Sequence, residues 1–92
     1  MQVNLYANFR LHAGVKTFDL DFAPGTNVYQ AVLRIVSRYP RLRKDWLDEN
    51  DGLNAHVLVF IDGNEVGGLP KGLDTALQPE NVLDFFPPLA GG

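Results

Sequence analysis

Two stretches near the start of the sequence alternate between apolar and polar residues, and this period of two most constrains the fold. The alternation covers residues 3–9 and 15–22 and is typical of half-buried strands. Ala13-Gly14 between them predicts a turn, so we expect a hairpin of two strands. The apolar sides of the two predicted strands consist of Val3, Leu5, Ala7 and Phe9, and of Phe18, Leu20 and Phe22.

After a break at Pro24-Gly25, the apolar spacing changes to that of one face of a helix. Asn27 and Gln30 have the spacing of a capping box, which predicts where the helix begins. Pro40 is expected to end it. The apolar face of this predicted helix contains Val28, Ala31, Val32, Ile35, Val36 and Tyr39.

The second half of the sequence predicts a return to strands. Residues 55–61 are almost continuously apolar, as expected for a strand near the centre of a sheet. The other expected elements are a short helical turn or ordered loop within 41–54, a tight turn at Asp62-Gly63-Asn64, a short edge segment near Glu65-Val66, a small turn of helix around Leu73, Ala76 and Leu77, and a last strand over 82–86.

The resulting order, β-β-α-(turn)-β-β-β, predicts an α+β domain with a β-grasp (ubiquitin-like) fold, a mixed sheet packed on one main helix. We expect the first and last long strands to lie side by side as a parallel pair. The domain is expected over residues 1–86, with an extended tail over 87–92.

Composition narrows the possible functions. Of the 92 residues 46% are hydrophobic, which is typical of one globular domain. The net charge is 8 − 11 = −3, so binding to nucleic acid backbones is not expected. No apolar run approaches the ~18 residues of a membrane span. There is no cysteine and thus no thiolate chemistry. We expect a cytoplasmic protein with no membrane partner.

The last six residues of the sequence are the strongest functional signal. Pro87 and Pro88 lack an N–H and have a fixed φ, so they end the last strand and hold the chain extended. Gly91 and Gly92 have no side chain beyond Cα and can enter a narrow slot. Leu89 and Ala90 lie between. The pattern predicts a terminal carboxylate carried on a thin stalk and presented to another protein.

Other candidate groups favour ordinary structural roles. His12 and His56 lack a ligand cluster, so no metal site is expected. Trp46, with Leu42 and Leu47, is interpreted as a satellite apolar cluster. Two charged sets are expected on solvated surfaces: the basic stretch of Arg38, Arg41, Arg43 and Lys44, and the carboxylates of Asp19, Asp21 and Asp84. Residues 67–72 do not form a nucleotide-binding P-loop.

The order of elements, together with the closing run, resembles the MoaD/ThiS family of ubiquitin-like sulfur carriers. The closing run is Val82-Leu83-Asp84-Phe85-Phe86-Pro87-Pro88-Leu89-Ala90-Gly91-Gly92. Residues 6–10 and 59–65 also resemble the corresponding segments of the family. The 41–54 segment is more like archaeal-type and cysteine-linked members. Glu80-Asn81 departs from the Gly-Asp that is usual in the family, although Asn tolerates the same turn.

This resemblance implies a carrier or co-substrate rather than an enzyme. An E1-like enzyme would use ATP to adenylate the Gly92 carboxylate, and a persulfide would then convert it to a thiocarboxylate that donates sulfur. No cofactor is expected to be bound. The resemblance points to molybdopterin synthesis, with the large synthase subunit as partner. Sulfur transfer for cysteine or tRNA thiolation, a protein modifier forming isopeptide bonds through Gly92, and a plain binding module remain alternatives.

A docking surface is also expected near the tail. Tyr6, Leu58, Phe60 and Phe86 can be placed on the sheet face away from the helix. Exposed apolar patches of this kind often mark interfaces, although core or dimer packing is the competing explanation.

Overall fold

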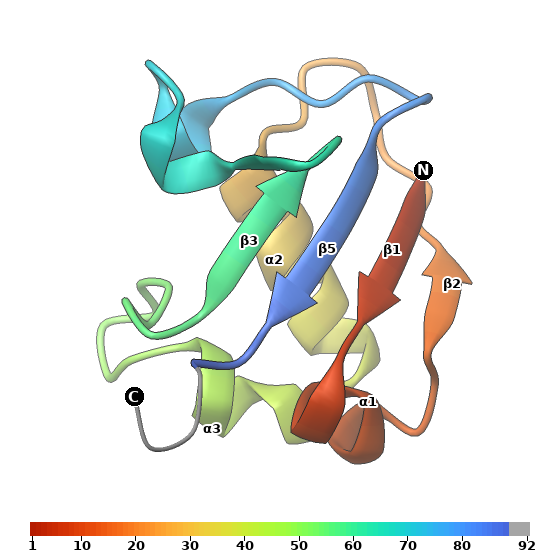
Figure 1. The fold of residues 1–92 in the computed structure, drawn as a ribbon, viewed down its shortest axis with the longest axis vertical. Coiled ribbons are helices and arrows are strands. Elements are labelled where there is room, and N and C mark those ends of the chain that lie inside the picture. The colour runs from red at the N-terminus through yellow and green to blue at the C-terminus, as the bar shows by residue number, and fades with distance from the viewer. Residues whose placement is uncertain (89–92) are drawn as a thin grey trace.

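A computed structural model describes residues 1–88 as a mixed sheet crossed on one face by a long helix (Figure 1). The strand order is β2-β1-β5-β3-β4, with β1 and β5 parallel and the other neighbours antiparallel. This is the expected β-grasp arrangement, with the first and last long strands side by side. The strands are β1 (Gln2–Leu5), β2 (Thr17–Asp19), β3 (Leu58–Ile61), β4 (Asn64–Glu65) and β5 (Val82–Phe86).

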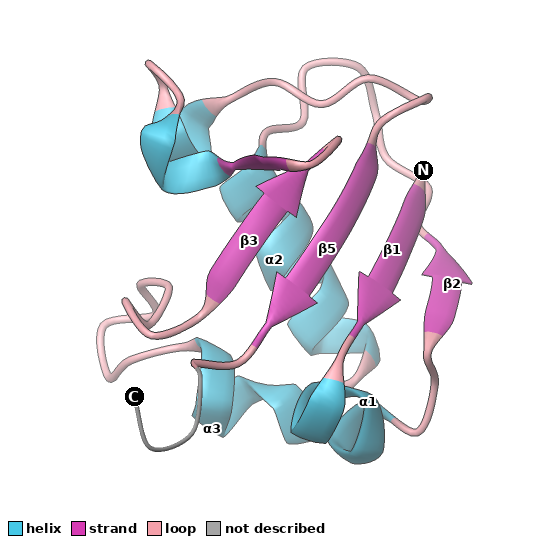
Figure 2. Cartoon of the chain, in the orientation of Figure 1, coloured by secondary structure: helices cyan, strands magenta, loops and turns pink. Residues whose placement is uncertain are grey.

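Helical segments lie behind the sheet, at its lower end and at the upper left beside the end of β3 (Figure 2). The longest, α2, runs behind β5 and β3 in this view, and α1 and α3 lie below the sheet. The α-helices are α1 (Ala7–Ala13), α2 (Val28–Arg38) and α3 (Arg43–Trp46). Three 3-10 turns accompany them: η1 (Pro40–Leu42), η2 (Val66–Gly68) and η3 (Gly72–Asp74). Among residues 1–88, no helix has both the length and the apolar character needed to cross a membrane.

Helix α2 confirms the prediction from apolar spacing. The side chain of Asn27 accepts a hydrogen bond from the Gln30 N–H at 2.8 Å, and the Gln30 side chain accepts one from the Asn27 N–H at 2.9 Å. This reciprocal pair satisfies two N–H groups that the first turn leaves free. The buried face consists of Val28, Ala31, Val32, Ile35 and Val36.

The predicted long strand over residues 3–9 is wrong. β1 ends at Leu5, and the chain turns through Ala7 (φ 53°) into α1. Phe9 is buried as predicted, but from a helix, and its ring meets the Trp46 ring edge-on with 5.5 Å between centroids. Gly14 (φ 79°) ends the helix and donates its N–H to Arg10 O at 2.9 Å. It therefore caps a helix instead of forming a hairpin turn.

The pairing of the two predicted strands is nevertheless correct. β1 and β2 are antiparallel, with Val3 opposite Phe18. β2 is shorter than the predicted 15–22 segment because only Thr17–Asp19 has a strand partner.

The interpretation of Trp46 as part of a satellite cluster is also wrong. Its side chain is fully buried, and its ring stacks on Phe85 of the central strand with 4.3 Å between centroids. Leu42 and Leu47 are buried in the same core. The reason is that η1 and α3 fold beneath the end of the sheet, so that residues from 41–54 reach the inner face of β5. The buried apolar side chains of residues 1–88 form one core, between the sheet and its helices.

The remaining predictions for the second half need small changes. Helical turns within 41–54 are confirmed as η1 and α3. β3 begins at Leu58 rather than at residue 55, because Val57 still donates its N–H to Asn54 O in a turn. The helical turn expected up to Leu77 is limited to η3, and Ala76 instead bridges to Asn27. The last strand lies where it was predicted. The edge segment expected near Glu65-Val66 is β4, which begins one residue earlier at Asn64, and Val66 belongs to η2.

Candidate functional site

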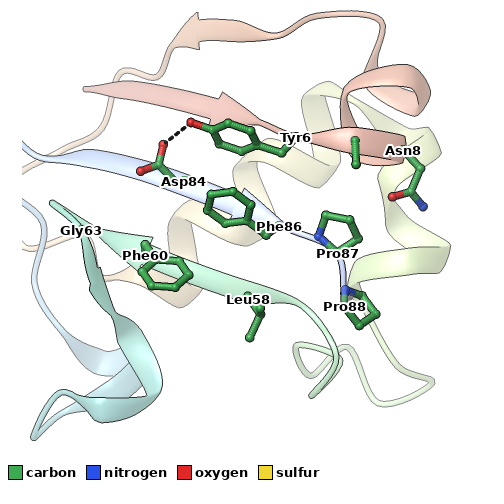
Figure 3. Close-up of a pocket in the computed structure, with 10 residues that line it drawn as sticks. Tyr6, Asn8, Leu58, Phe60, Gly63, Asp84, Phe86, Pro87 and Pro88 are labelled. Carbon is green, nitrogen blue, oxygen red and sulfur yellow. Dashed lines mark hydrogen bonds between the residues drawn. The ribbon is translucent and has the colours of Figure 1, made fainter. Parts of the chain in front are cut away.

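The sheet face opposite α2 holds the side chains of the predicted docking surface (Figure 3). Side chains of paired residues on neighbouring strands point to the same face, and successive residues alternate between faces. Phe86 is paired with Leu58, and Asp84 with Phe60, so these four residues share one face. Phe85 between them points inward and is fully buried. The register of β3 and β5 thus brings Leu58, Phe60 and Phe86 together.

Three aromatic rings form the centre of this face. The Tyr6 and Phe86 rings stack with 4.2 Å between centroids and 11° between planes. Phe60 meets Phe86 edge-on at 5.5 Å and 86°. Such pairs add stabilisation beyond the apolar area that they bury. All three residues are only partly buried, so the cluster is fixed in position while part of its surface stays open to a partner.

The cluster lines an open groove of ≈ 850 Å³. The groove contains all four predicted docking residues and the two prolines of the tail. It also contains residues that sequence reasoning did not assign to it. The lining residues are Tyr6, Ala7, Asn8, Leu58, Phe60, Gly63, Asp84, Phe86, Pro87 and Pro88. One of these unassigned lining residues is Asp84, which lies on the sheet surface as predicted. Because it is two residues from Phe86 in the same strand, the sequence already indicated that both side chains lie on one face.

Asp84 is the acidic group of the groove lining. Its Oδ1 accepts hydrogen bonds from Asn4 Nδ2 at 2.8 Å and from the Tyr6 hydroxyl at 3.3 Å. The pKa of Tyr6 is raised above its ordinary value of 10.0, first by desolvation and then by the charge and the hydrogen bond of Asp84. Both effects favour the neutral phenol, which donates to the carboxylate.

The base of the tail is held by the central strand. Phe85 is anchored in the core, Phe86 lies in the groove, and the Tyr6 N–H donates to Phe85 O at 3.2 Å. Pro87 and Pro88 follow directly along the groove wall (Figure 3). The predicted site residues Leu89, Ala90, Gly91 and Gly92 lie outside the described residues. What the structure adds is a fixed starting point for the tail beside an aromatic groove.

The other candidate residues lie away from this groove. His12 Nδ1 is 2.6 Å from Asp45 Oδ2, linking α1 to α3. Within residues 1–88, no three His, Cys, Asp or Glu side chains gather as metal ligands would. Arg43 pairs with Asp51 at the surface. Arg38 donates to Asp19 O at 2.9 Å, and its guanidinium lies 5.0 Å from the Phe18 ring centroid.

Comparison with known proteins decides the family. A family model described as the ThiS family matches residues 3–92. This chain belongs to the ThiS family. The match confirms the resemblance drawn from the closing run, and ThiS-family members are small ubiquitin-like carrier proteins rather than catalytic enzymes.

Solved structures of similar chains confirm the β-grasp fold of this ThiS-family protein. Small archaeal modifier protein 1 from Haloferax volcanii has 25% identity and a TM-score of 0.88, with 99% of this chain and 97% of that chain covered. A putative molybdopterin converting factor subunit 1 from Pyrococcus furiosus has 25% identity and a TM-score of 0.75, covering 96% and 95%.

A third similar structure is a complex of BexX and CysO from Amycolatopsis orientalis. It has 23% identity and a TM-score of 0.77, with 99% of this chain and 98% of that chain covered. The similarity at this identity concerns the fold. A search of curated proteins gave no match.

Proposed function

We propose that this ThiS-family protein is a sulfur carrier whose reactive group is the carboxylate of Gly92. The observation that carries the proposal is that the family match runs to residue 92 and so includes the Gly91-Gly92 ending. The aromatic groove at the base of the tail supports it, because a carrier needs a surface by which its activating enzyme holds it.

A carboxylate is a poor acyl donor because its charge is delocalised. An E1-like enzyme would therefore join the Gly92 carboxylate to the α-phosphate of ATP, releasing pyrophosphate. A persulfide sulfur then displaces AMP, and a thiol cleaves the resulting acyl disulfide to leave the thiocarboxylate. The carrier contributes by positioning its own C-terminus. When the partner enzyme binds the folded domain at the groove, the tail reaches the reaction centre already oriented, which lowers the entropic cost of the reaction.

The sulfur acceptor we favour is the large subunit of molybdopterin synthase. Two things support this choice: the Phe-Phe-Pro-Pro ending and the similarity to a putative molybdopterin converting factor subunit. Cysteine synthesis and tRNA thiolation use the same activated carrier. They are distinguished by supplying the thiocarboxylate form to each candidate acceptor and measuring which one consumes it.

A second candidate function is protein modification. The similarity to a small archaeal modifier protein over 99% of this chain favours it. The two functions share the acyl adenylate and differ in what attacks it. A persulfide leads to a carrier, whereas a lysine amine leads to an isopeptide bond.

The proposal is tested by incubating the full chain with an E1-like activating enzyme, ATP and a persulfide source. Exchange of one oxygen for sulfur should raise the intact mass by about 16 Da. Larger lysine-linked species would instead support modification. A variant lacking Gly91 and Gly92 should gain no mass but keep the circular dichroism and melting curve of the wild type, because the buried core residues within the described residues 1–88 lie between Val3 and Phe85. An unmodified wild-type end would refute both candidate functions.

A further inference from the structure

We propose that the protein that docks on the groove presents a basic side chain to Asp84, next to an apolar surface that covers the Tyr6–Phe86–Phe60 rings. This inference deepens the proposed function, on which it rests: it names the chemistry by which the activating enzyme holds the carrier. The occupant of the groove is therefore a protein surface that is both apolar and positively charged.

The strand register shows that the whole outward face of the sheet lacks basic residues. One cross-strand row runs Thr17, Asn4, Asp84, Phe60, Glu65. Neighbouring outward positions are Gln2, which is paired with both Asp19 and Val82, and Phe86, which is paired with Leu58. Among the strand residues that point outward, the charged ones are all acids: Asp19, Glu65 and Asp84.

The charge of Asp84 has no cationic partner within the described part of the chain. Its two recorded hydrogen bonds both go to Oδ1 and come from neutral donors, Asn4 and Tyr6. Oδ2 accepts none from residues 1–88. The ion pairs found in the same residues, His12–Asp45 and Arg43–Asp51, belong to the helical end and its following loop. A half-buried carboxylate beside three aromatic rings is thus fixed in place with one oxygen available.

Covering this groove with an uncharged apolar surface would remove water from Asp84 without replacing its hydrogen bonds. That desolvation is costly, whereas a basic group on the partner offsets it. Arginine fits better than lysine, because its planar guanidinium pairs with a carboxylate and also lies flat on aromatic rings. The neighbouring acids, Asp19 and Glu65, add attraction at longer range that salt screens.

The test is the affinity of the full chain for the activating enzyme, measured by calorimetry without ATP so that chemistry is not required. Asp84→Asn removes the charge and nearly preserves the shape. One control is matched to it. Asp21→Asn makes the same change in net charge at an exposed position outside the groove.

We expect Asp84→Asn to weaken binding about tenfold in about 0.05 M salt, with a smaller ratio in about 0.5 M salt. Asp21→Asn should stay within about threefold of the wild type. The inference is overturned if Asp84→Asn binds like Asp21→Asn, if the loss is independent of salt, or if the wild type does not bind. Binding as expected without any mass change at Gly92 would instead reject the sulfur-carrier proposal and leave this inference standing.

Discussion

At the scale of single residues, Tyr6 and Asp84 connect the polar and aromatic parts of the groove. Desolvation of the phenol, and then the charge and the hydrogen bond of Asp84, disfavour phenolate formation, so the pKa of Tyr6 is raised. A raised pKa in the folded state means that this contribution to stability is complete below the unfolded pKa of about 10. It is lost as pH rises through the folded pKa.

Asp84→Asn should therefore lower the pKa of Tyr6 toward its ordinary value. The Asn side chain removes the negative charge, while desolvation, which is the largest cause of the shift, remains. The measurement is a pH titration of tyrosine ring signals by NMR, with Tyr6 assigned by comparison with Tyr6→Phe. Asp21→Asn serves as the control and should leave the titration unchanged. An unaltered Tyr6 titration in Asp84→Asn would show that the carboxylate does not act on the phenol.

At the scale of elements, α1 is the segment in which the sequence pattern and the structure differ. The apolar residues Ala7 and Phe9, two apart in the sequence, fit a strand. In the structure Ala7 is exposed and Phe9 is buried on the inner side of a short helix. The composition of α1 includes good helix formers, and Arg10 and His12 lie in its last turn, where positive charge is favourable. Gly14 then ends the helix in the left-handed region, which glycine adopts without strain.

Gly14→Ala should destabilise the domain by about 1 kcal/mol, because alanine at φ 79° is strained even though no atom lies within 4 Å of the added Cβ. Gly68→Ala is the matched control: its added Cβ also meets nothing within 4 Å, and its φ is not in the left-handed region. We expect no loss of stability there. The free energies of unfolding come from urea titrations followed by circular dichroism. Equal losses in both variants would mean that the left-handed conformation of Gly14 is not the cause.

At the scale of the whole molecule, the inner side of the sheet has a structural role and the outer side carries the candidate docking surface. The inner side holds the single core, in which α2, α3 and α1 all contribute residues. The outer side carries the groove, whose rings are partly open. β5 belongs to both, since Leu83 and Phe85 point inward and Asp84 and Phe86 outward. This strand also leads directly into the tail, so the core fixes the point from which the tail starts.

The largest loss of stability should come from the helical end of this single core. Trp46→Ala removes a fully buried ring stacked on Phe85, and we expect a cost of about 3–5 kcal/mol. Leu11→Ala, at a side chain that is 71% exposed, should change stability by no more than about 0.5 kcal/mol. Urea unfolding followed by far-UV circular dichroism measures both. A small effect at Trp46 would mean that the cluster around it contributes little to the core.

The sequence by itself determined the elements whose signals are long and agree with one another. The α2 helix combines five buried positions at helical spacing with a capping box, and β5 combines alternation with a proline stop. It also determined the family, because Pro87-Pro88 and Gly91-Gly92 are a specific ending confirmed by the match over residues 3–92. In these cases, the information lies between residues close together in the chain.

Tertiary structure alone decided what depends on contacts between distant residues. Residues 7–13 are helical, and Trp46 belongs to the main core, because the segments η1 and α3 fold beneath the sheet and meet Phe9 and Phe85. The groove exists because the register pairs Leu58 with Phe86 and Phe60 with Asp84. No local pattern specifies register across 20 or more intervening residues. Shape and charge at the docking surface are therefore properties of the folded chain.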